Sequence, residues 1–282
     1  MKILITGANG QLGSELRDVF KDRTGYELFF LDRKQLPLEQ TNLIQDILGM
    51  YQPDLIIHAG AYTAVDKAES EPVLADQVNH LASEEIAQYC RLHAAKLIAI
   101  STDYVFDGNS ERPLTEDAAV APVNTYGETK LKGELAIQKW APHYIIIRTS
   151  WVYSTYGANF VKTMIRLMNE RDEISVIADQ IGSPTYAFDL ARAILTIVES
   201  DKWENGIYNF SNEGQISWYD FAVAIRELKA LACQIHAIPT EQYPTPAKRP
   251  KYSLLDKSKV KTTFQLDVPS WKDSLQKMLN KL

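Results

Sequence analysis

The sequence predicts a doubly wound α/β fold, with helices on both faces of a parallel β-sheet and a smaller C-terminal lobe after it. Two observations predict this fold. Short β-branched runs alternate with longer stretches of helical period, which is the pattern of βαβ units. Two of these runs, Leu55–Ile57 and Leu97–Ile100, are apolar throughout, as parallel strands buried on both faces require.

Strands and helices are expected to alternate through the first part of the chain. The expected strands are Lys2–Thr6, Glu27–Leu31, Leu55–His58, Lys96–Ser101, Tyr144–Arg148 and Ile174–Ile177. The expected helices are Leu12–Phe20, Val73–Leu92, Asn124–Lys139 and Asn159–Asn169. After Thr149 the alternation loosens, and the prolines between 239 and 250 predict a loop. We therefore expect a dinucleotide-binding domain over 1–150, to which a segment near 174–200 returns, and a lobe mainly over 151–282.

Composition excludes several classes of partner. The net charge of −6 gives no overall attraction to nucleic acid or to an anionic membrane. The first apolar run, Ile3–Ile5, is too short for a signal peptide, and no later run approaches the length of a membrane span. Two cysteines, Cys90 and Cys233, suit a reducing compartment. We expect a cytoplasmic protein without nucleic-acid or membrane partners.

A glycine-rich turn, Gly7-Ala8-Asn9-Gly10-Gln11-Leu12-Gly13, joins the first expected strand to the first expected helix. Glycines there let backbone N–H groups approach a pyrophosphate at the positive end of the helix, although such a turn also serves simple packing. Asp32 ends the second strand and is placed to accept a ribose 2′-hydroxyl, whereas Arg33 suits a 2′-phosphate. Either NADPH or NADH is therefore expected.

Tyr126 and Lys130 are four residues apart on an expected helix and share one face. Chance alone supplies about one such pair in this chain, so context decides. Thr102 follows a strand whose carboxyl end lies where open α/β sheets bind ligands. Carbonyl reduction needs a hydride and an acid, and a nearby ammonium lowers the pKa of a phenol. We expect Tyr126 to be the acid, Lys130 to lower its pKa and Thr102 to orient the substrate oxygen; a surface Tyr–Lys pair is the alternative.

Over nearly its whole length the chain resembles the extended short-chain dehydrogenases/reductases, and within them the reductases of nucleotide-linked 4-keto sugars. The residues that carry the resemblance are Ile3–Gly7 with Gly10–Gly13, His58–Thr63 with Val65-Asp66 and Ala68-Glu69, Ser101–Gly108, Tyr126-Gly127 with Lys130 and Gly133-Glu134, Arg148–Tyr153, and Gly182–Thr185. The run Ser101–Gly108 is too long for chance to explain easily.

The resemblance implies a Rossmann-like fold and reduction of the C4 keto group of dTDP-4-dehydro-β-L-rhamnose to dTDP-L-rhamnose, for cell-surface polysaccharide. It implies Thr102, Tyr126 and Lys130 as the catalytic trio, and Asp103 and Trp151 as sugar contacts. The expected cofactor-binding residues are Gly7, Asn9, Gly10, Gln11, Leu12, Gly13, Asp32, Arg33, Glu39, Gln40, Gly60, Ala61, Tyr62, Thr63, Tyr126 and Lys130. The expected substrate-binding residues are Thr102, Asp103, Tyr126, Trp151 and Arg249.

Three features sit outside this core pattern. The basic segment Lys248-Arg249-Lys251 suits a clamp for the sugar nucleotide's pyrophosphate, because Arg pairs bidentately with phosphate oxygens, or else it is a solvated loop. Asn79 is a candidate to anchor backbone near the site. Glu39-Gln40 stands where the family usually has an Asp followed by an apolar residue, which leaves the detailed adenine or ribose contact open.

Some relatives form a dimer bridged by magnesium through glutamates near the first helix and near the C-terminus. Glu15 fits the first position, but no Glu follows Glu241. We therefore expect no metal site, and a monomer or a homodimer without that bridge.

Two other functions stay open from the sequence. The first is a nucleotide-sugar epimerase or dehydratase that retains NAD, although Tyr104 replaces the Glu that usually follows the acidic residue of dehydratases. The second is a non-catalytic, reductase-like regulatory subunit, against which the intact Thr102, Tyr126 and Lys130 argue.

Overall fold

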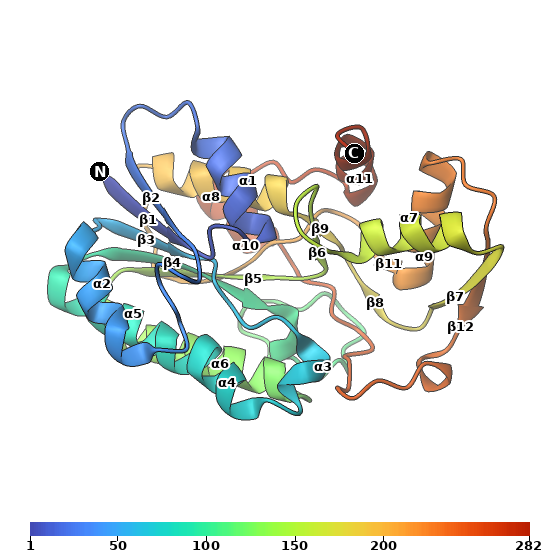
Figure 1. Cartoon of the computed structure of the whole chain (residues 1–282), viewed down its shortest axis with the longest axis horizontal. Coiled ribbons are helices and arrows are strands. Elements are labelled where there is room, and N and C mark those ends of the chain that lie inside the picture. The colour runs from blue at the N-terminus through green and yellow to red at the C-terminus, as the bar shows by residue number, and fades with distance from the viewer.

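A six-stranded sheet forms the larger part of the molecule in the computed structural model, which describes all 282 residues (Figure 1). The strand order is β10-β5-β4-β3-β1-β2, and every neighbouring pair is parallel. The strands are β1 (Lys2–Thr6), β2 (Glu27–Leu31), β3 (Leu55–His58), β4 (Lys96–Thr102), β5 (Tyr144–Thr149) and β10 (Gly206–Asn209). Because β2 lies on one side of β1 and β3 on the other, the strand order reverses there, where such sheets bind ligands.

Helices cover both faces of this sheet, and successive strand residues therefore pack into two different cores. Ile3 and Ile5 point to one core and Leu4 to the other. The first face carries α1 (Gln11–Phe20), α8 (Ala187–Glu199) and α10 (Ser258–Phe264), and the second carries α2 (Ile44–Tyr51), α5 (Ala82–His93) and α6 (Thr125–Trp140). The predicted Rossmann-like, doubly wound fold class is confirmed.

The helix predicted over Val73–Leu92 is interrupted by one turn of π-helix. The structure has α4 (Pro72–Asp76), a π-helical turn (Gln77–Leu81) and then α5, with the short α3 (Val65–Ala68) before them. A π turn inserts an extra residue into the helix, and such insertions are frequent at functional sites. Here the turn carries Asn79, whose side chain is buried.

The C-terminal lobe lies beside the sheet, on the right in Figure 1. In it β7 (Glu173–Ile177) pairs with β12 (Gln234–Ile238), and a third core of 17 buried residues lies beneath. The remaining elements are α7 (Phe160–Glu170), α9 (Trp218–Leu228), α11 (Trp271–Leu279), and the two short strand pairs β6 (Val152–Tyr153) with β9 (Thr185–Tyr186) and β8 (Ile181–Gly182) with β11 (Ile216–Ser217). None of the helices is long and apolar enough to cross a membrane.

The segment predicted to return to the sheet near 174–200 does so only in part. Helix α8 packs against α1 on the sheet, as expected. The prediction is wrong for 174–177, because β7 pairs with β12 inside the lobe. The sheet position beside β5 is taken instead by β10, a strand that the sequence did not indicate.

Candidate active site

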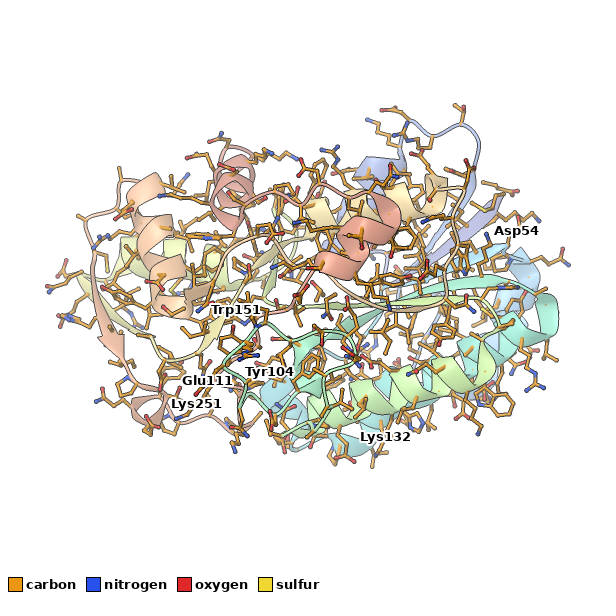
Figure 2. All side chains as sticks on the ribbon, turned by 180° about the vertical axis from the view of Figure 1, so that it is seen from behind. Asp54, Tyr104, Glu111, Lys132, Trp151 and Lys251 are labelled. Carbon is orange, nitrogen blue, oxygen red and sulfur yellow. The ribbon has the colours of Figure 1, made fainter.

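A cavity of about 710 Å³ opens at the carboxyl ends of the sheet strands. The loops after β1, β2, β3 and β5 line it, together with the end of β4 and the start of α6. In Figure 2, Tyr104 and Trp151 lie where the sheet and the lobe meet. The predicted site residues that line the cavity are Gly7, Asn9, Gly10, Gln11, Leu12, Asp32, Arg33, Glu39, Gly60, Ala61, Tyr62, Thr63, Thr102, Asp103, Tyr126, Lys130 and Trp151. Gly13, Gln40 and Arg249 do not line it.

The glycine-rich turn is packed too tightly for side chains at two positions. Gly7 has φ +68°, and a Cβ there would lie 2.7 Å from the backbone nitrogen of Gly60. A Cβ on Gly13 would lie 2.3 Å from the carbonyl oxygen of Gly7. Gly10 is the N-cap of α1 and makes no side-chain hydrogen bond to it, which leaves the first N–H groups of the helix to a ligand. The turn therefore fits the pyrophosphate of a dinucleotide.

Polar side chains gather where β2 ends, and Asp32 there lies 23 residues after Asn9 of the glycine-rich turn. The Asp32 carboxylate accepts hydrogen bonds from Asn9 Nδ2 at 3.1 Å and from the backbone of Lys34 at 2.9 Å. The neighbouring Arg33 guanidinium donates to Glu39 Oε1 through Nε at 3.1 Å and through Nη2 at 2.9 Å. An acidic acceptor at this place suits the hydroxyls of an adenosine ribose.

The three predicted catalytic residues come from two adjacent elements and are all buried. Thr102 is the last residue of β4, and Tyr126 and Lys130 occupy the first turns of α6. Helix α6 begins at Thr125 because the side chain of Asn124 caps it. The Asn124 side-chain oxygen accepts a hydrogen bond from the Gly127 nitrogen at 2.8 Å. The structure therefore brings the trio together at the mouth of the sheet.

The sequence predicted a lowered pKa for Tyr126, and the structure gives the opposite direction. Burial raises the pKa of Tyr126 to about 12, the Thr102 hydrogen bond lowers it, and the Asp103 charge raises it. Lys130 does not offset this rise, since its ammonium donates to the Ile100 carbonyl oxygen at 2.7 Å and burial lowers its own pKa to about 8. Tyr126 therefore keeps its proton at neutral pH, as a proton donor must.

Asp103 is a buried carboxyl beside this trio. Its Oδ1 accepts from the Thr102 hydroxyl at 3.1 Å, whereas its Oδ2 is buried without a partner. Burial raises the pKa of Asp103 to about 6. Buried polar atoms are nearly always paired, so the unpaired oxygen is suited to accept a hydroxyl group of a ligand.

Asn79 fixes the backbone on one side of the cavity. Its Oδ1 accepts from the Tyr62 nitrogen at 2.8 Å, and its Nδ2 donates to the Tyr62 oxygen at 3.1 Å and to Thr129 Oγ1 at 3.1 Å. The π-helical turn that carries Asn79 is thus tied both to the loop after β3 and to α6. This supports the anchoring role that the sequence suggested for Asn79.

Two aromatic contacts were not predicted from the sequence. The Tyr104 ring packs edge-on against Tyr126, with centroids 5.5 Å apart. The Trp218 ring, from the lobe, stacks on Trp151 at 3.7 Å. Trp151 itself has φ +48°, an unusual conformation for a bulky residue that is often found at functional sites. No local motif marks Trp218, because its partner lies in a distant part of the chain.

Arg249 lies outside the cavity and already has an acidic partner. Its guanidinium donates to Asp66 Oδ2 at 2.8 Å and to Thr245 Oγ1 at 2.5 Å. Lys251 is exposed and lies 3.5 Å from a carboxylate oxygen of Glu241. The phosphate clamp built from this segment stays a prediction.

Comparison with known proteins identifies the family. The model of the RmlD substrate binding domain matches residues 1–282. The dTDP-4-dehydrorhamnose reductase of Aggregatibacter actinomycetemcomitans is 40% identical over 98% of this chain and 97% of its own length. The Escherichia coli (strain K12) enzyme of that name is 39% identical, over 100% of this chain and 98% of its own.

Solved structures agree with these relatives. The dTDP-4-dehydrorhamnose reductase of Clostridium acetobutylicum superposes with a TM-score of 0.96 at 39% identity, covering 100% of this chain and 99% of that one. The Bacillus anthracis reductase, solved in complex with NADP, has a TM-score of 0.94 at 39% identity with the same coverage. A UDP-glucose 4-epimerase from Thermus thermophilus, 19% identical over 99% of this chain and 98% of its own with a TM-score of 0.82, shares the fold. The chain therefore belongs to the dTDP-4-dehydrorhamnose reductase family.

Proposed function

We propose that this chain reduces the C4 keto group of dTDP-4-dehydro-β-L-rhamnose to give dTDP-L-rhamnose, with NADPH or NADH as the reductant. The reaction would serve nucleotide-sugar synthesis for cell-surface polysaccharide. The observation that carries the proposal is that Thr102, Tyr126 and Lys130 line one cavity with the glycine-rich turn. Membership of the reductase family supports the identity of the sugar.

In this mechanism the bound nicotinamide supplies a hydride to C4. Tyr126 donates its phenolic proton to the carbonyl oxygen as the C=O π pair moves onto that oxygen, which leaves a tyrosinate. The Thr102 hydrogen bond lowers the pKa of Tyr126 and so stabilises the tyrosinate. The Lys130 ammonium, charged below its pKa of about 8 and on the same helix face as Tyr126, would bind the nicotinamide ribose. A proton from water restores Tyr126.

The residue after Asp103 favours reduction over dehydration. A dehydratase needs a base at this place to remove a proton from the sugar. Here the residue is Tyr104, and burial together with the Asp103 charge raises the pKa of its phenol. A phenol that stays protonated at neutral pH is a poor base, so the dehydratase alternative loses support.

The function is tested with purified protein, dTDP-4-dehydro-β-L-rhamnose and each reduced cofactor. We expect the nicotinamide absorbance to fall as the sugar nucleotide gains two hydrogen atoms, detected by mass spectrometry. Tyr126→Phe removes the proton donor and should lower kcat by about a hundredfold or more. No absorbance change with either cofactor would defeat the proposal, and an undiminished rate in the variant would exclude Tyr126 as the acid.

We also propose that no magnesium ion bridges two copies of this chain. Glu15, the one residue that fits the bridging pattern, is buried and accepts from Ser154 Oγ at 2.6 Å. We expect the same gel-filtration volume in magnesium chloride and in EDTA. A shift toward a larger species in magnesium would contradict this.

Cytoplasmic location stays a prediction. Cys90 and Cys233, on which that prediction rests, are buried free thiols.

A further inference from the structure

The end of the cavity beside β2 holds one positive and two negative side chains, Arg33, Asp32 and Glu39. Both hydrogen bonds of the Arg33 guanidinium go to one oxygen of Glu39, at 3.1 and 2.9 Å. The Arg33 side chain is 75% exposed and that of Glu39 is 26% exposed, so this pair joins an exposed cation to a more enclosed carboxylate. The guanidinium also lowers the pKa of Glu39 through its hydrogen bond and charge, although burial opposes this.

The second carboxylate, Asp32, is fixed in place independently of Arg33. It accepts from Asn9 Nδ2 at 3.1 Å and from the backbone nitrogens of Lys34 and Gln35 at 2.9 and 3.1 Å. It therefore remains beside the ribose position whichever partner Arg33 takes. A carboxylate there accepts a hydrogen bond from a 2′-hydroxyl but repels a 2′-phosphate.

NADPH differs from NADH only by a phosphate on that 2′-oxygen. Arg33 is the cation at this end of the cavity that is suited to pair with such a phosphate. Its Nε and Nη2 donors are already engaged by Glu39, so a phosphate that pairs bidentately with this side of the guanidinium has to break that pair and leave the Glu39 carboxylate close to a dianion. NADH has no 2′-phosphate, so it can bind while the Arg33–Glu39 pair stays intact.

We propose that Glu39 determines cofactor preference by competing with the 2′-phosphate of NADPH for Arg33, which weakens NADPH relative to NADH. This inference rests on the proposed function, because it places a nicotinamide dinucleotide in the cavity with its adenosine ribose beside β2. It assigns Glu39 a role in specificity and leaves the transfer of hydride and proton to the other end of the cavity.

The test measures dissociation constants of NADPH and NADH by nicotinamide fluorescence, without substrate or turnover. In Glu39→Gln the side chain keeps its size and loses its charge. We expect NADPH to bind about two- to fivefold more tightly, the upper part of the range of a partly exposed ion pair, and NADH to change by less than about twofold. Glu27→Gln, at the far and exposed end of β2, is the matched control and should change neither constant.

The competition itself is tested in the Arg33→Ala background. Arg33→Ala should weaken NADPH and spare NADH, and adding Glu39→Gln to it should give no further gain in NADPH binding. A gain in NADPH binding that persisted without Arg33 would show simple charge repulsion and would overturn the proposed competition. Equal gains for both cofactors in Glu39→Gln, or no gain for either, would also overturn it. If the wild-type protein bound neither dinucleotide, the proposed function would fail, and this inference with it.

Discussion

Tyr126 and Lys130 lie one helical turn apart on α6, and burial moves their pKa values in opposite directions. Burial raises the pKa of the Tyr126 phenol to about 12 and lowers the pKa of the Lys130 ammonium to about 8. Both shifts have the same cause, because burial disfavours the charged form of each group. Near pH 8 it is therefore Lys130 that changes its charge, while Tyr126 remains a proton donor.

This order of ionisation predicts an alkaline limb in the rate profile. We expect kcat/KM to fall as pH rises through about 8, because Lys130 then loses the charge with which it would bind the nicotinamide ribose. Lys130→Met should be slower by about a hundredfold and flat across this range. The measurement is kcat/KM from pH 6 to 10. A limb near 8 that survived in Lys130→Met would belong to another group.

Asp103 predicts a dependence of stability on pH. Its pKa is about 6 in the folded protein against 3.8 in the unfolded chain, so the folded state binds its proton more tightly. This stabilisation is complete below about pH 4 and is lost as pH rises through 6, with an upper limit of about 3 kcal/mol. Urea unfolding from pH 4 to 8 should show that loss in the wild type and a smaller one in Asp103→Asn. Parallel curves for the two proteins would contradict the shift.

The grouping of Thr102, Tyr126 and Lys130 in one cavity could be predicted from the sequence, whereas the electrostatics of these residues could not. Tyr126 and Lys130 are four residues apart on one helix, and Thr102 follows a recognisable strand, so local pattern suffices to place them. The direction of the Tyr126 pKa shift depends on burial by segments far away in sequence. The contact of Trp218 with Trp151 depends on how the lobe folds, which no local spacing indicates.

At the scale of single elements, two glycines in helices differ sharply in what surrounds them. A Cβ on Gly13 in α1 would lie 2.3 Å from the Gly7 carbonyl oxygen, whereas one on Gly49 in α2 meets nothing within 4 Å. The first glycine is required by the close approach of α1 to the turn before it. The second carries only the entropic cost of glycine in a helix.

We therefore expect opposite effects from the same substitution at these two positions. Gly13→Ala should lower the free energy of unfolding by about 1–3 kcal/mol through overpacking and should weaken dinucleotide binding. Gly49→Ala should raise the free energy of unfolding by about 0.5–1 kcal/mol and leave binding unchanged. Urea unfolding and fluorescence titration measure both. Equal effects in the two variants would show that the turn is not tightly packed against α1.

The interruption of the helix over 73–92 shows why element boundaries near the site are hard to predict. The periodic pattern of that stretch is compatible with one continuous helix. The π-helical turn arises where Asn79 bonds to the Tyr62 backbone and to Thr129, on two other elements. Sequence pattern reports the period of a helix but not such contacts.

At the scale of the whole molecule, five of the six sheet strands were predicted and the sixth was assigned to the wrong segment. Ile174–Ile177 and β10 are both short, β-prone stretches, and only their partners distinguish them. Strand β10 begins at Gly206 and pairs with β5, which ends at Thr149, so the two partners are far apart in the sequence. Pairing over such a distance leaves no mark in local periodicity.

We predict that the division of the chain at residue 150 is not a folding boundary. About half of the 21 buried residues in the core shared by α1 and α8 come from beyond it. A fragment of residues 1–150 would lack α8, α10 and β10, and it should show no cooperative urea transition by circular dichroism. The full chain is the control. A cooperative transition in the fragment would establish an independent domain.

Strand β10 comes late in the sequence, and this position has a consequence during synthesis. Translation releases the chain from the N-terminus, so β5 is complete well before Gly206–Asn209 leaves the ribosome. Until then the nascent chain presents the open hydrogen-bonding edge of β5 and a bare apolar face where α8 will pack. This interval is when the protein is most exposed to aggregation, and a translation pause within residues 150–205 would prolong it.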